Sequence, residues 1–370
     1  MTQSDDPSVQ RILAGGLATP EQVDEALAIR AKMQEMGVKP LPVSDILFEK
    51  GWIDRDALDG LRREERRVSG QEQIAGYRLV ELLGQGAMAS VYKARQLSLD
   101  RDVAIKVLAP GLARDPGHVR RFQEEARTVA RLAHTNLVSG IDVGEADGIH
   151  YLVMEYADGN TVGSLVRRGG PLDEERALVI AQQVARALDH AHKNGLVHRD
   201  VKPDNIIVTR EGVAKLCDLG LARLDEGEGS AAERGGTPDY ISPEQARGEA
   251  AVDARSDLYS LGATLFHMLA GRPPFEGGSA AAVMARHLTE PVPPLNAVGA
   301  DVDARTEALV ARLLAKLPGE RYASASELLQ ALEALVRDLQ QERSRPGAAA
   351  APGAPAAPAK PAAPVARRRR

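Results

Sequence analysis

The stretch from Val197 to Asn205 constrains this chain most, because nine residues bring together three groups suited to one kind of chemistry. The carboxylate of Asp200 comes five residues before the amide of Asn205, and the cation of Lys202 stands between them. Phosphoryl transfer needs a positioned hydroxyl, neutralised phosphate charge and a bound Mg²⁺. A proton acceptor, a cation and a neutral metal ligand meet those needs. One such nonapeptide can arise by chance, so the prediction depends on partner segments elsewhere.

A glycine-rich segment lies upstream, with Gly84 and Gly86 at its centre. Glycine has no Cβ, so the backbone can bend there and approach a phosphate closely. The spacing alone is weak, because dinucleotide-binding folds carry a similar one. Here residues 91–94 and 103–108 have the pattern of two strands joined by a polar turn, whereas a dinucleotide site would continue into a long helix.

The second of these strands places a lysine opposite its most apolar face. Side chains alternate along a strand, so Ala104 and Lys106 share one face while Val103, Ile105 and Val107 share the other. A helix predicted over 119–133 follows, with an apolar stripe. It contains two adjacent carboxylates that can pair with the lysine.

Further segments follow Asn205 in a fixed order. The triplet from Asp218 to Gly220 begins thirteen residues later, and the segment from Gly236 to Glu244 reads Gly-Thr-Pro-Asp-Tyr-Ile-Ser-Pro-Glu. Together with the glycine-rich segment and Lys106, these resemble protein kinases, and in particular bacterial serine/threonine kinases of the eukaryotic type. The resemblance covers residues 77–336 and implies transfer of phosphate from ATP to protein hydroxyls.

The resemblance implies an α+β, two-lobed protein kinase fold. A small antiparallel β lobe with one key helix would precede a larger helical lobe. Three positions depart from the family pattern. Ala89 replaces the third glycine, Leu219 replaces phenylalanine, and Ser242 replaces alanine.

The resemblance also implies residue roles. Asp200 receives the hydroxyl proton, Lys202 steadies the γ-phosphate and Lys106 holds the α- and β-phosphates. Asn205 and Asp218 bind Mg²⁺, which Mn²⁺ can replace. The residues expected around ATP are Leu83, Gly84, Gln85, Gly86, Ala87, Met88, Ala89, Ser90, Val91, Ala104, Lys106, Met154, Glu155, Ala157, Thr161 and Ile207.

Other positions are expected to support or regulate the site. Glu125 is the expected ion-pair partner of Lys106, and Glu124 beside it is expected to be solvated. Glu244 pairs with Arg321, and Asp257 braces the catalytic loop.

Arg199 suits a phosphate on the activation segment, because a guanidinium binds that anion in a bidentate manner. Ser230 is the one hydroxyl residue of residues 221–235 and our candidate phosphorylation site; a solvated loop serine is the alternative. Thr237 is expected to help dock the substrate. It also favours the serine/threonine class.

Two function classes follow from these residues. The first is an active serine/threonine protein kinase. The second is a pseudokinase-like scaffold that acts through its N-terminal helical domain. Such a scaffold has often lost Lys106, Asp200 or Asp218, and this chain has all three.

Residues 1–64 are predicted to form a separate small helical domain with a weak internal repeat. Gly16 and Gly51 stand 35 residues apart, each ending a short helix, and Thr19 and Asp54 follow as helix caps. This region resembles the helical N-terminal domains of secretion and pilus-assembly ATPases. A regulatory partner, a nucleotide ligand or simple packing onto the kinase domain are the alternatives for its role.

The remaining segments are a linker at 65–76, a helix extension at 337–345 and an Ala/Pro-rich tail at 346–370 that ends in four arginines. The tail is expected to be disordered, because it has too few apolar side chains to bury. The net charge of −5 gives no strong nucleic-acid signal. There is no run of 18 apolar residues, and Cys217 is the only cysteine, so we expect a cytoplasmic protein.

Overall fold

The computed structural model describes residues 9, 12–13, 15–35, 40–55, 57–58, 61, 74, 76–86, 88–146, 148–218, 238–249 and 252–344. The chain falls into two compact units. The first comprises Met1–Asn160 and Ile207–Gly236, and the second comprises Thr161–Ile206 and Thr237–Arg370.

The internal repeat near the N-terminus appears in the structure as two matching helix ends. Helix α3 (Val43–Glu49) ends just before Gly51, whose φ of +70° matches the +62° of Gly16. A glycine adopts this left-handed conformation without the clash of a Cβ. After Gly16, the Leu17 N–H donates to the Ile12 carbonyl at 3.1 Å, and the equivalent bond after Gly51 measures 2.9 Å. Both ends therefore close with the hydrogen bond typical of a Schellman motif.

The next helix of each repeat begins with a side-chain cap. Thr19, just before α2 (Pro20–Glu35), accepts a hydrogen bond from the Gln22 N–H at 3.3 Å. Asp54 accepts one from the Ala57 N–H at 2.8 Å. The buried core of this region is formed by Val9, Ile12, Val23, Ala26, Val43, Ile46, Leu47, Ile53, Leu58 and Leu61.

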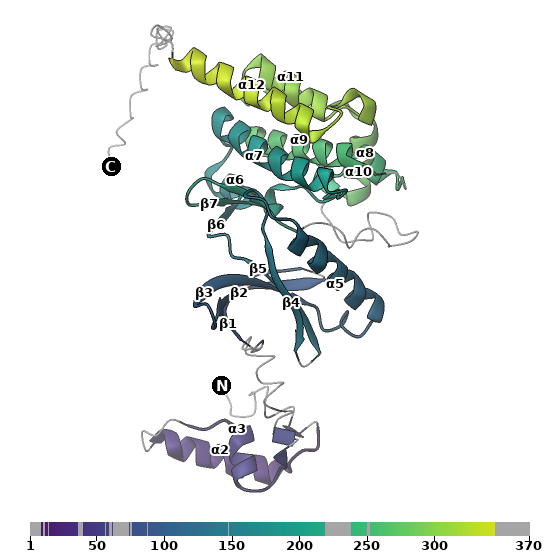
Figure 1. The fold of residues 1–370 in the computed structure, drawn as a ribbon. Coiled ribbons are helices and arrows are strands. Elements are labelled where there is room, and N and C mark those ends of the chain that lie inside the picture. The colour runs from purple at the N-terminus through teal and green to yellow at the C-terminus, as the bar shows by residue number, and fades with distance from the viewer. Residues whose placement is uncertain are drawn as a thin grey trace, which may run out of the picture. The chain divides into compact units, whose positions relative to one another are not determined.

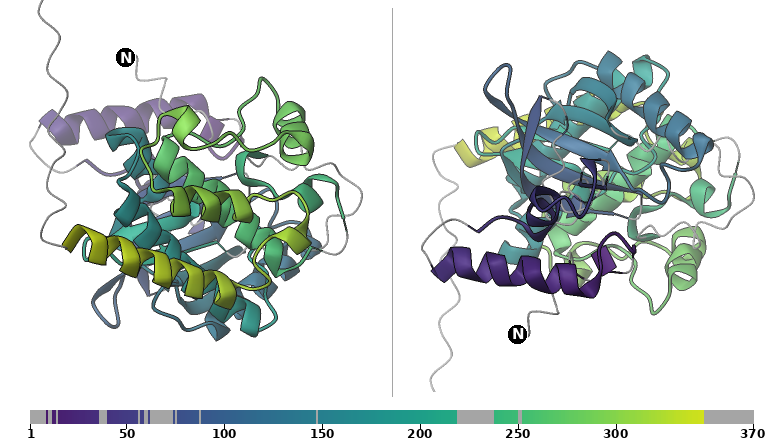
Figure 2. Two further views of the ribbon diagram at one scale, coloured as in Figure 1. Left: turned by 90° about the horizontal axis from the view of Figure 1, so that it is seen from above. Right: turned by 90° about the horizontal axis from the view of Figure 1, so that it is seen from below.

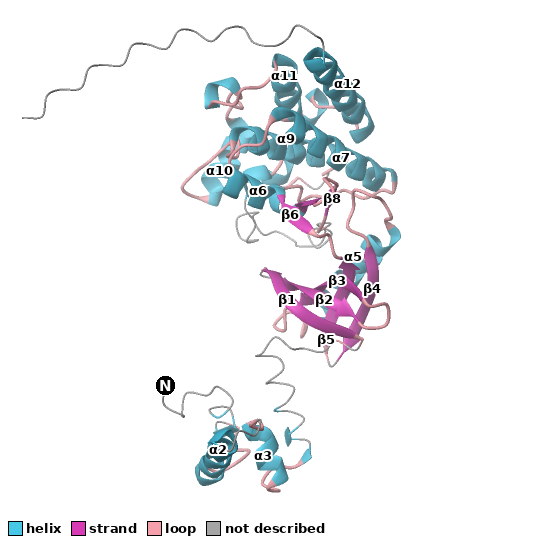
Figure 3. Ribbon diagram, turned by 90° about the vertical axis from the view of Figure 1, so that its left-hand side faces the viewer, coloured by secondary structure: helices cyan, strands magenta, loops and turns pink. Residues whose placement is uncertain are grey.

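The first unit also contains a five-stranded antiparallel sheet, drawn in magenta in Figure 3. Its strands are β1 (Tyr77–Gln85), β2 (Ala89–Gln96), β3 (Arg101–Leu108), β4 (Gly140–Ala146) and β5 (Ile149–Glu155), in the order β1-β2-β3-β5-β4. Val103 and Ile105 belong to one core cluster and Ala104 belongs to another, as the alternation of β3 predicts.

Helix α5 (Pro116–Arg131) packs beside β4 in the same unit, as Figure 1 shows. It begins three residues before the predicted start, because Asp115 accepts a hydrogen bond from the Gly117 N–H at 2.8 Å and caps the helix. It also ends before Leu132, whose backbone is extended. The buried face consists of Phe122, Glu125, Ala126 and Val129.

A second sheet of three short strands has the order β6-β7-β8. These strands are β6 (Gly159–Thr161), β7 (Ile206–Thr209) and β8 (Ala214–Leu216). The segment after α5 holds β8 in place. Asn136 donates from its side chain to the Ala214 carbonyl at 2.9 Å, and its own carbonyl accepts from the Leu216 N–H at 2.8 Å.

The second unit is helical. Its elements are α6 (Val162–Gly169), α7 (Glu174–Lys193), η2 (Pro203–Asn205), η4 (Pro238–Tyr240), α8 (Pro243–Ala246), α9 (Ala254–Ala270), α10 (Ala280–Thr289), η5 (Asn296–Val298), α11 (Ala304–Leu313), η6 (Pro318–Glu320) and α12 (Ala325–Ser344). Helix α9 is buried along most of its length. Helices α7 and α11 pack against α9, and α12 packs against α7 (Figures 1 and 2).

Helix α12 runs without a break from Ala325 to Ser344 and includes most of the segment predicted as a helix extension at 337–345. Its buried leucines, Leu328, Leu332, Leu335 and Leu339, recur at the spacing of one face of a helix. Among the helices that the structure describes, none has both the length and the apolar character needed to cross a bilayer.

Several predictions concern residues outside those described. They are Ala87, Leu219, Gly220, Ser230, Thr237, nearly all of the linker, and the tail from 346 to 370.

Candidate active site

In the first unit, Lys106 lies between two carboxylates. Its Nζ atom is 2.8 Å from Oε1 of Glu125 and 3.1 Å from Oδ1 of Asp218. Strand β3 directs Lys106 toward the face that α5 covers, and Glu125 is on the buried face of α5. The Glu125 side chain is only 7% exposed, whereas that of Asp218 is 40% exposed. The sequence paired Lys106 with Glu125 alone, so the contact with Asp218 is an addition.

The ion pairs keep Lys106 charged. Burial on its own would lower the pKa of the Lys106 ammonium, but the nearby carboxylates of Asp218 and Glu125 raise that pKa above its usual range. The lysine therefore provides a fixed positive charge at physiological pH, which suits it to hold an anionic ligand.

Asp218 has a strained backbone. Its φ is +57°, a region that residues with a Cβ seldom occupy. Asp218 follows β8, which the segment containing Asn136 holds in place. Cys217 beside it packs, partly buried, against the core cluster that contains Ala104. Strained residues of this kind are concentrated at functional sites, where the surrounding structure supports them.

The glycine-rich turn joins β1 to β2 in the same unit. The Gly86 N–H donates to the Ala89 carbonyl at 2.9 Å, and Gln85 pairs with Ser90 across the strands. Apart from its chain neighbours, none of the residues that the structure describes has an atom within 4 Å of the position that a Cβ would take at Gly84, and at Gly86 the Ala89 carbonyl oxygen lies 3.5 Å from that position. Among the described residues, the side-chain position at Gly84 is therefore open, which suits close approach of a phosphate.

Five of the residues predicted around ATP divide by burial. Ala104 and Met154 are buried in the cluster beneath α5, and Val91 packs against it. Leu83 is 45% exposed, and Met88 is 37% exposed.

Three more of the predicted residues, Glu155, Ala157 and Thr161, lie where the chain leaves β5, and a fourth, Ile207, lies on β7. The Glu155 carboxylate forms an ion pair with Lys215 at 2.9 Å, and Ala157 is half-buried, as is Ile207. The Thr161 hydroxyl accepts from the Ser164 N–H at 3.1 Å and caps α6. Thr161 was expected only among the residues around ATP, so this capping role is a finding of the structure.

In the second unit, Asp200 receives two donors on one oxygen. Lys202 Nζ lies 2.7 Å from Asp200 Oδ2, and Asn205 Nδ2 lies 3.0 Å from the same atom. Asn205 Nδ2 also donates to the Asp200 carbonyl at 2.9 Å. These bonds fix which end of the Asn205 amide faces the aspartate, and they leave its oxygen at the other end, the type of ligand that Mg²⁺ takes.

Asp257, buried in α9, holds the backbone just before Asp200. Its carboxylate accepts hydrogen bonds from the His198 N–H at 2.8 Å and the Arg199 N–H at 2.7 Å. Nε2 of His192 lies 2.8 Å from the same carboxylate. The φ of Arg199 is +66°, the second strained position near the predicted catalytic residues. The bracing role proposed for Asp257 has these contacts as its physical basis.

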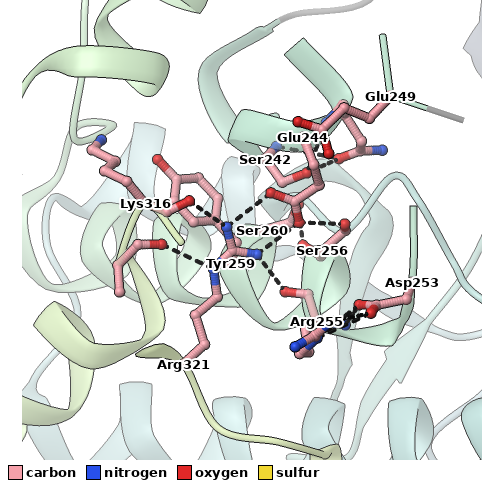
Figure 4. Close-up of polar contacts among 12 residues, drawn as sticks. Ser242, Glu244, Glu249, Asp253, Arg255, Ser256, Tyr259, Ser260, Lys316 and Arg321 are labelled. Atoms are coloured by element: carbon pink, nitrogen blue, oxygen red, sulfur yellow. Dashed lines mark hydrogen bonds and ion pairs between the residues drawn. The ribbon is translucent and has the colours of Figure 1, made fainter. Parts of the chain in front are cut away.

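Glu244 and Arg321 form a buried ion pair, shown in Figure 4. The two guanidinium nitrogens lie 2.7 and 2.8 Å from the two carboxylate oxygens. Arg321 also donates to the carbonyls of Ala315 and Arg255, and Ser256 donates to Glu244. The pair thus joins α8, α9 and the segment before α12.

Sequence reasoning did not find several polar contacts of the second unit. The Tyr240 hydroxyl lies 2.6 Å from Nδ1 of His267. The Arg167 guanidinium pairs with Asp204 at 2.9 Å. Gln245 donates to a backbone carbonyl of the catalytic loop. No sequence motif links these residues, because their contacts join segments that are distant along the chain.

The comparison with protein families matches residues 77–332 to the family described as protein kinase domain. Serine/threonine-protein kinase PknB of Mycolicibacterium smegmatis is 45% identical over 261 residues, which are 68% of this chain and 41% of that protein. A probable serine/threonine-protein kinase of Clostridium perfringens is 40% identical over 264 residues, 71% of this chain and 38% of that protein. This chain therefore aligns with about two fifths of the length of these relatives.

Solved structures give the same family. The kinase domain of Mycobacterium tuberculosis PknI is similar with a TM-score of 0.57 and 34% identity, covering 71% of this chain and 98% of that one. The family match begins at residue 77, and the comparisons do not support a likeness of the N-terminal region to secretion ATPases.

Proposed function

This chain belongs to the protein kinase family, and on that basis we propose that it is an active serine/threonine protein kinase. It transfers the γ-phosphate of ATP to serine or threonine hydroxyls of proteins, including its own. The observation that carries the proposal is the Lys106 ammonium, held at 2.8 and 3.1 Å from the carboxylates of Glu125 and Asp218.

The first unit supplies the nucleotide-binding residues in this proposal. Lys106 binds the α- and β-phosphates, and the backbone around Gly84 and Gly86 approaches them. Ala104 and Met154 line the adenine site with apolar side chains. The solved structure of Rad53 1-466 is a complex with AMP-PNP, but at 23% identity the likeness of this chain to it concerns the fold alone.

Asp218 and Asn205 are the residues that would hold the metal, as the resemblance to the family implies. A carboxylate and an amide are hard oxygen ligands, and Mg²⁺ takes few protein ligands and completes its shell with phosphate and water. When bound, the cation neutralises charge on the phosphates.

The chemical step then uses groups of the catalytic loop. Asp200 orients the substrate hydroxyl and takes its proton as the hydroxyl oxygen bonds to the γ-phosphorus. The bond from that phosphorus to the β–γ bridging oxygen breaks, and ADP leaves. Lys202, 2.7 Å from Asp200 Oδ2, steadies negative charge beside the reacting groups.

The alternative of a catalytically silent scaffold has less support. A scaffold has no need to keep Lys106 charged between two carboxylates or to strain the backbone at Arg199 and Asp218. Such strain has to be offset by neighbouring contacts, which are present here for both residues.

Incubation of the full chain with Mg²⁺, γ-labelled ATP and a generic protein substrate tests the proposal, with Asp200→Asn as the control. We expect the wild-type chain to label itself and the substrate, and the variant to label neither. Equal labelling by the wild-type chain and the Asp200→Asn variant would rule out the proposed kinase activity.

A further inference from the structure

Gln245 stands at the first turn of α8 and takes part in a capping box with Ser242. The Ser242 hydroxyl accepts from the Gln245 N–H at 3.3 Å. In return, Gln245 Oε1 accepts from the Ser242 N–H at 3.2 Å and from the Ser242 hydroxyl at 3.0 Å. Ser242 is fully buried, and Gln245 is half-buried. This explains locally why serine can replace the alanine of the family pattern.

The other end of the Gln245 side chain reaches the catalytic loop. Its Nε2 atom donates to the Arg199 carbonyl at 3.0 Å, across 46 positions of sequence. A backbone N–H only donates and a carbonyl only accepts, so the amide can have only this orientation. Capping therefore uses the oxygen of Gln245, and the link to the loop uses its nitrogen.

The accepting carbonyl belongs to the peptide group that joins Arg199 to Asp200. The N–H at the other side of this peptide group is that of Asp200, and it donates to Nδ1 of His198 at 3.3 Å. Gln245 and His198 thus hold the two sides of one peptide plane.

That plane needs support because of the residue before it. Arg199 has a φ of +66°, and its own N–H is held by Asp257 at 2.7 Å. Residues with a Cβ populate this region sparsely, so the conformation persists only where neighbours enforce it. A rotation of the plane would turn the Asp200 backbone and move its carboxylate.

We propose that Gln245 is a positioning residue for Asp200, which fixes the Arg199–Asp200 peptide plane through the carbonyl of Arg199. This inference rests on the proposed kinase function. It assigns to the segment after the Ser-Pro-Glu motif a direct part in setting the geometry of the proton acceptor.

Gln245→Glu separates the two roles of the side chain. A glutamate can still accept from Ser242 and complete the cap, but its carboxylate cannot donate to the Arg199 carbonyl and repels it. The matched control is Gln330→Glu, the same substitution at an exposed position on α12. Both changes add one negative charge to the second unit.

Phosphorylation rates of the full chain would be measured at varied ATP, with the melting temperature of each variant. We expect Gln245→Glu to lower kcat about tenfold or more, the effect of one hydrogen bond, with an unchanged KM for ATP and little change in melting temperature. Gln330→Glu should match the wild type. Ser242→Ala keeps the link to Arg199, so it should lower the melting temperature but reduce kcat less than Gln245→Glu does.

A kcat of Gln245→Glu within about twofold of the wild type would overturn the inference. So would an equal loss in Gln330→Glu, or a loss of kcat that follows the melting temperature across all the variants. These outcomes differ from failure of the kinase proposal, in which the wild type itself would label no more than Asp200→Asn.

Discussion

Lys106 shows how one residue can connect stability and chemistry. A buried cation is tolerated here because two carboxylates lie within 3.1 Å of it. The Glu125 side chain is nearly fully buried, so removal of Lys106 would leave the Glu125 carboxylate without its nearest cation in an apolar setting. The charge that would hold phosphate is therefore part of the packing of α5 against the sheet.

We predict that Lys106→Met lowers kcat/KM about a hundredfold or more, because a preorganised positive charge at the phosphates is lost. It should also lower the melting temperature, because Glu125 would stay buried without its nearest cation. The double variant Lys106→Met/Glu125→Leu should regain stability but not activity. Recovery of activity in the double variant would contradict the phosphate-binding role of Lys106.

Lys316 is a half-buried lysine whose Nζ atom, unlike that of Lys106, has no carboxylate beside it among the described residues. Its Nζ lies 4.4 Å from the ring centre of Phe275 and has no hydrogen-bond partner among the described residues. Burial, with the charge of Arg321 nearby, lowers the pKa of Lys316 to about 8. The unfolded chain therefore binds more protons at this residue than the folded chain between about pH 8 and about pH 10.

The free energy of unfolding should rise with pH in that window on account of Lys316, because a higher pH disfavours the state that binds more protons, which here is the unfolded state. We predict that Lys316→Met removes this rise and increases the melting temperature at pH 7. Urea unfolding of both proteins at pH 7, 8.5 and 9.5 would measure it. A parallel pH dependence in the two proteins would show that other groups are responsible.

At the scale of elements, the pair of Glu244 and Arg321 holds α8 against α9 and the start of α12. Both side chains are buried, at 3% and 0% exposed. Burial would raise the pKa of Glu244, but hydrogen bonds from Arg321 and Ser256 lower it below its usual value. The stability that this carboxylate contributes is therefore present above the unfolded pKa of 4.5 and is lost as pH falls through the lower folded value.

Glu244→Gln should destabilise the second unit by about 3–5 kcal/mol at pH 7, because it leaves Arg321 buried without its anion. Urea unfolding at pH 7 and pH 4 would test this. The wild type should lose more stability than the variant on acidification. An equal loss in both would mean that Glu244 carries no part of the acid sensitivity.

The sequence predicted these elements where local signals agree. The alternation of β3 and the leucine face of α12 were visible as periodic patterns, and the structure has both. The start of α5 was missed because Asp115 and Pro116 cap and begin the helix before its apolar stripe. The contact of Lys106 with Asp218, and that of Gln245 with Arg199, join segments that are distant in sequence, and no local pattern encodes them.

At the scale of the whole molecule, the N-terminal region has its own core, whose members all come from residues 9–61. Its two repeats share one pattern of caps and left-handed glycines. A regulatory partner or nucleotide ligand for this region stays a prediction, and so does the expected cytoplasmic location of the chain.

We predict that this core unfolds separately. Leu47 is fully buried, and Leu47→Ala should cost about 2–5 kcal/mol, a large share of the stability of so small a domain. Hydrogen exchange should show faster exchange in residues 12–58 and unchanged exchange in residues 77–344, with kinase activity retained. Faster exchange throughout the sheet would show that the two cores are coupled.

The two carboxylates beside Lys106 also have a consequence for motion. If α5 swings away and takes Glu125 with it, the ammonium still has Asp218, which is 40% exposed and reached by solvent. Movement of α5 therefore does not leave the Lys106 ammonium without a carboxylate partner. An arrangement with α5 disengaged then lies closer in free energy than a single buried pair would allow, so modest binding energy from a partner is enough to shift the population toward it.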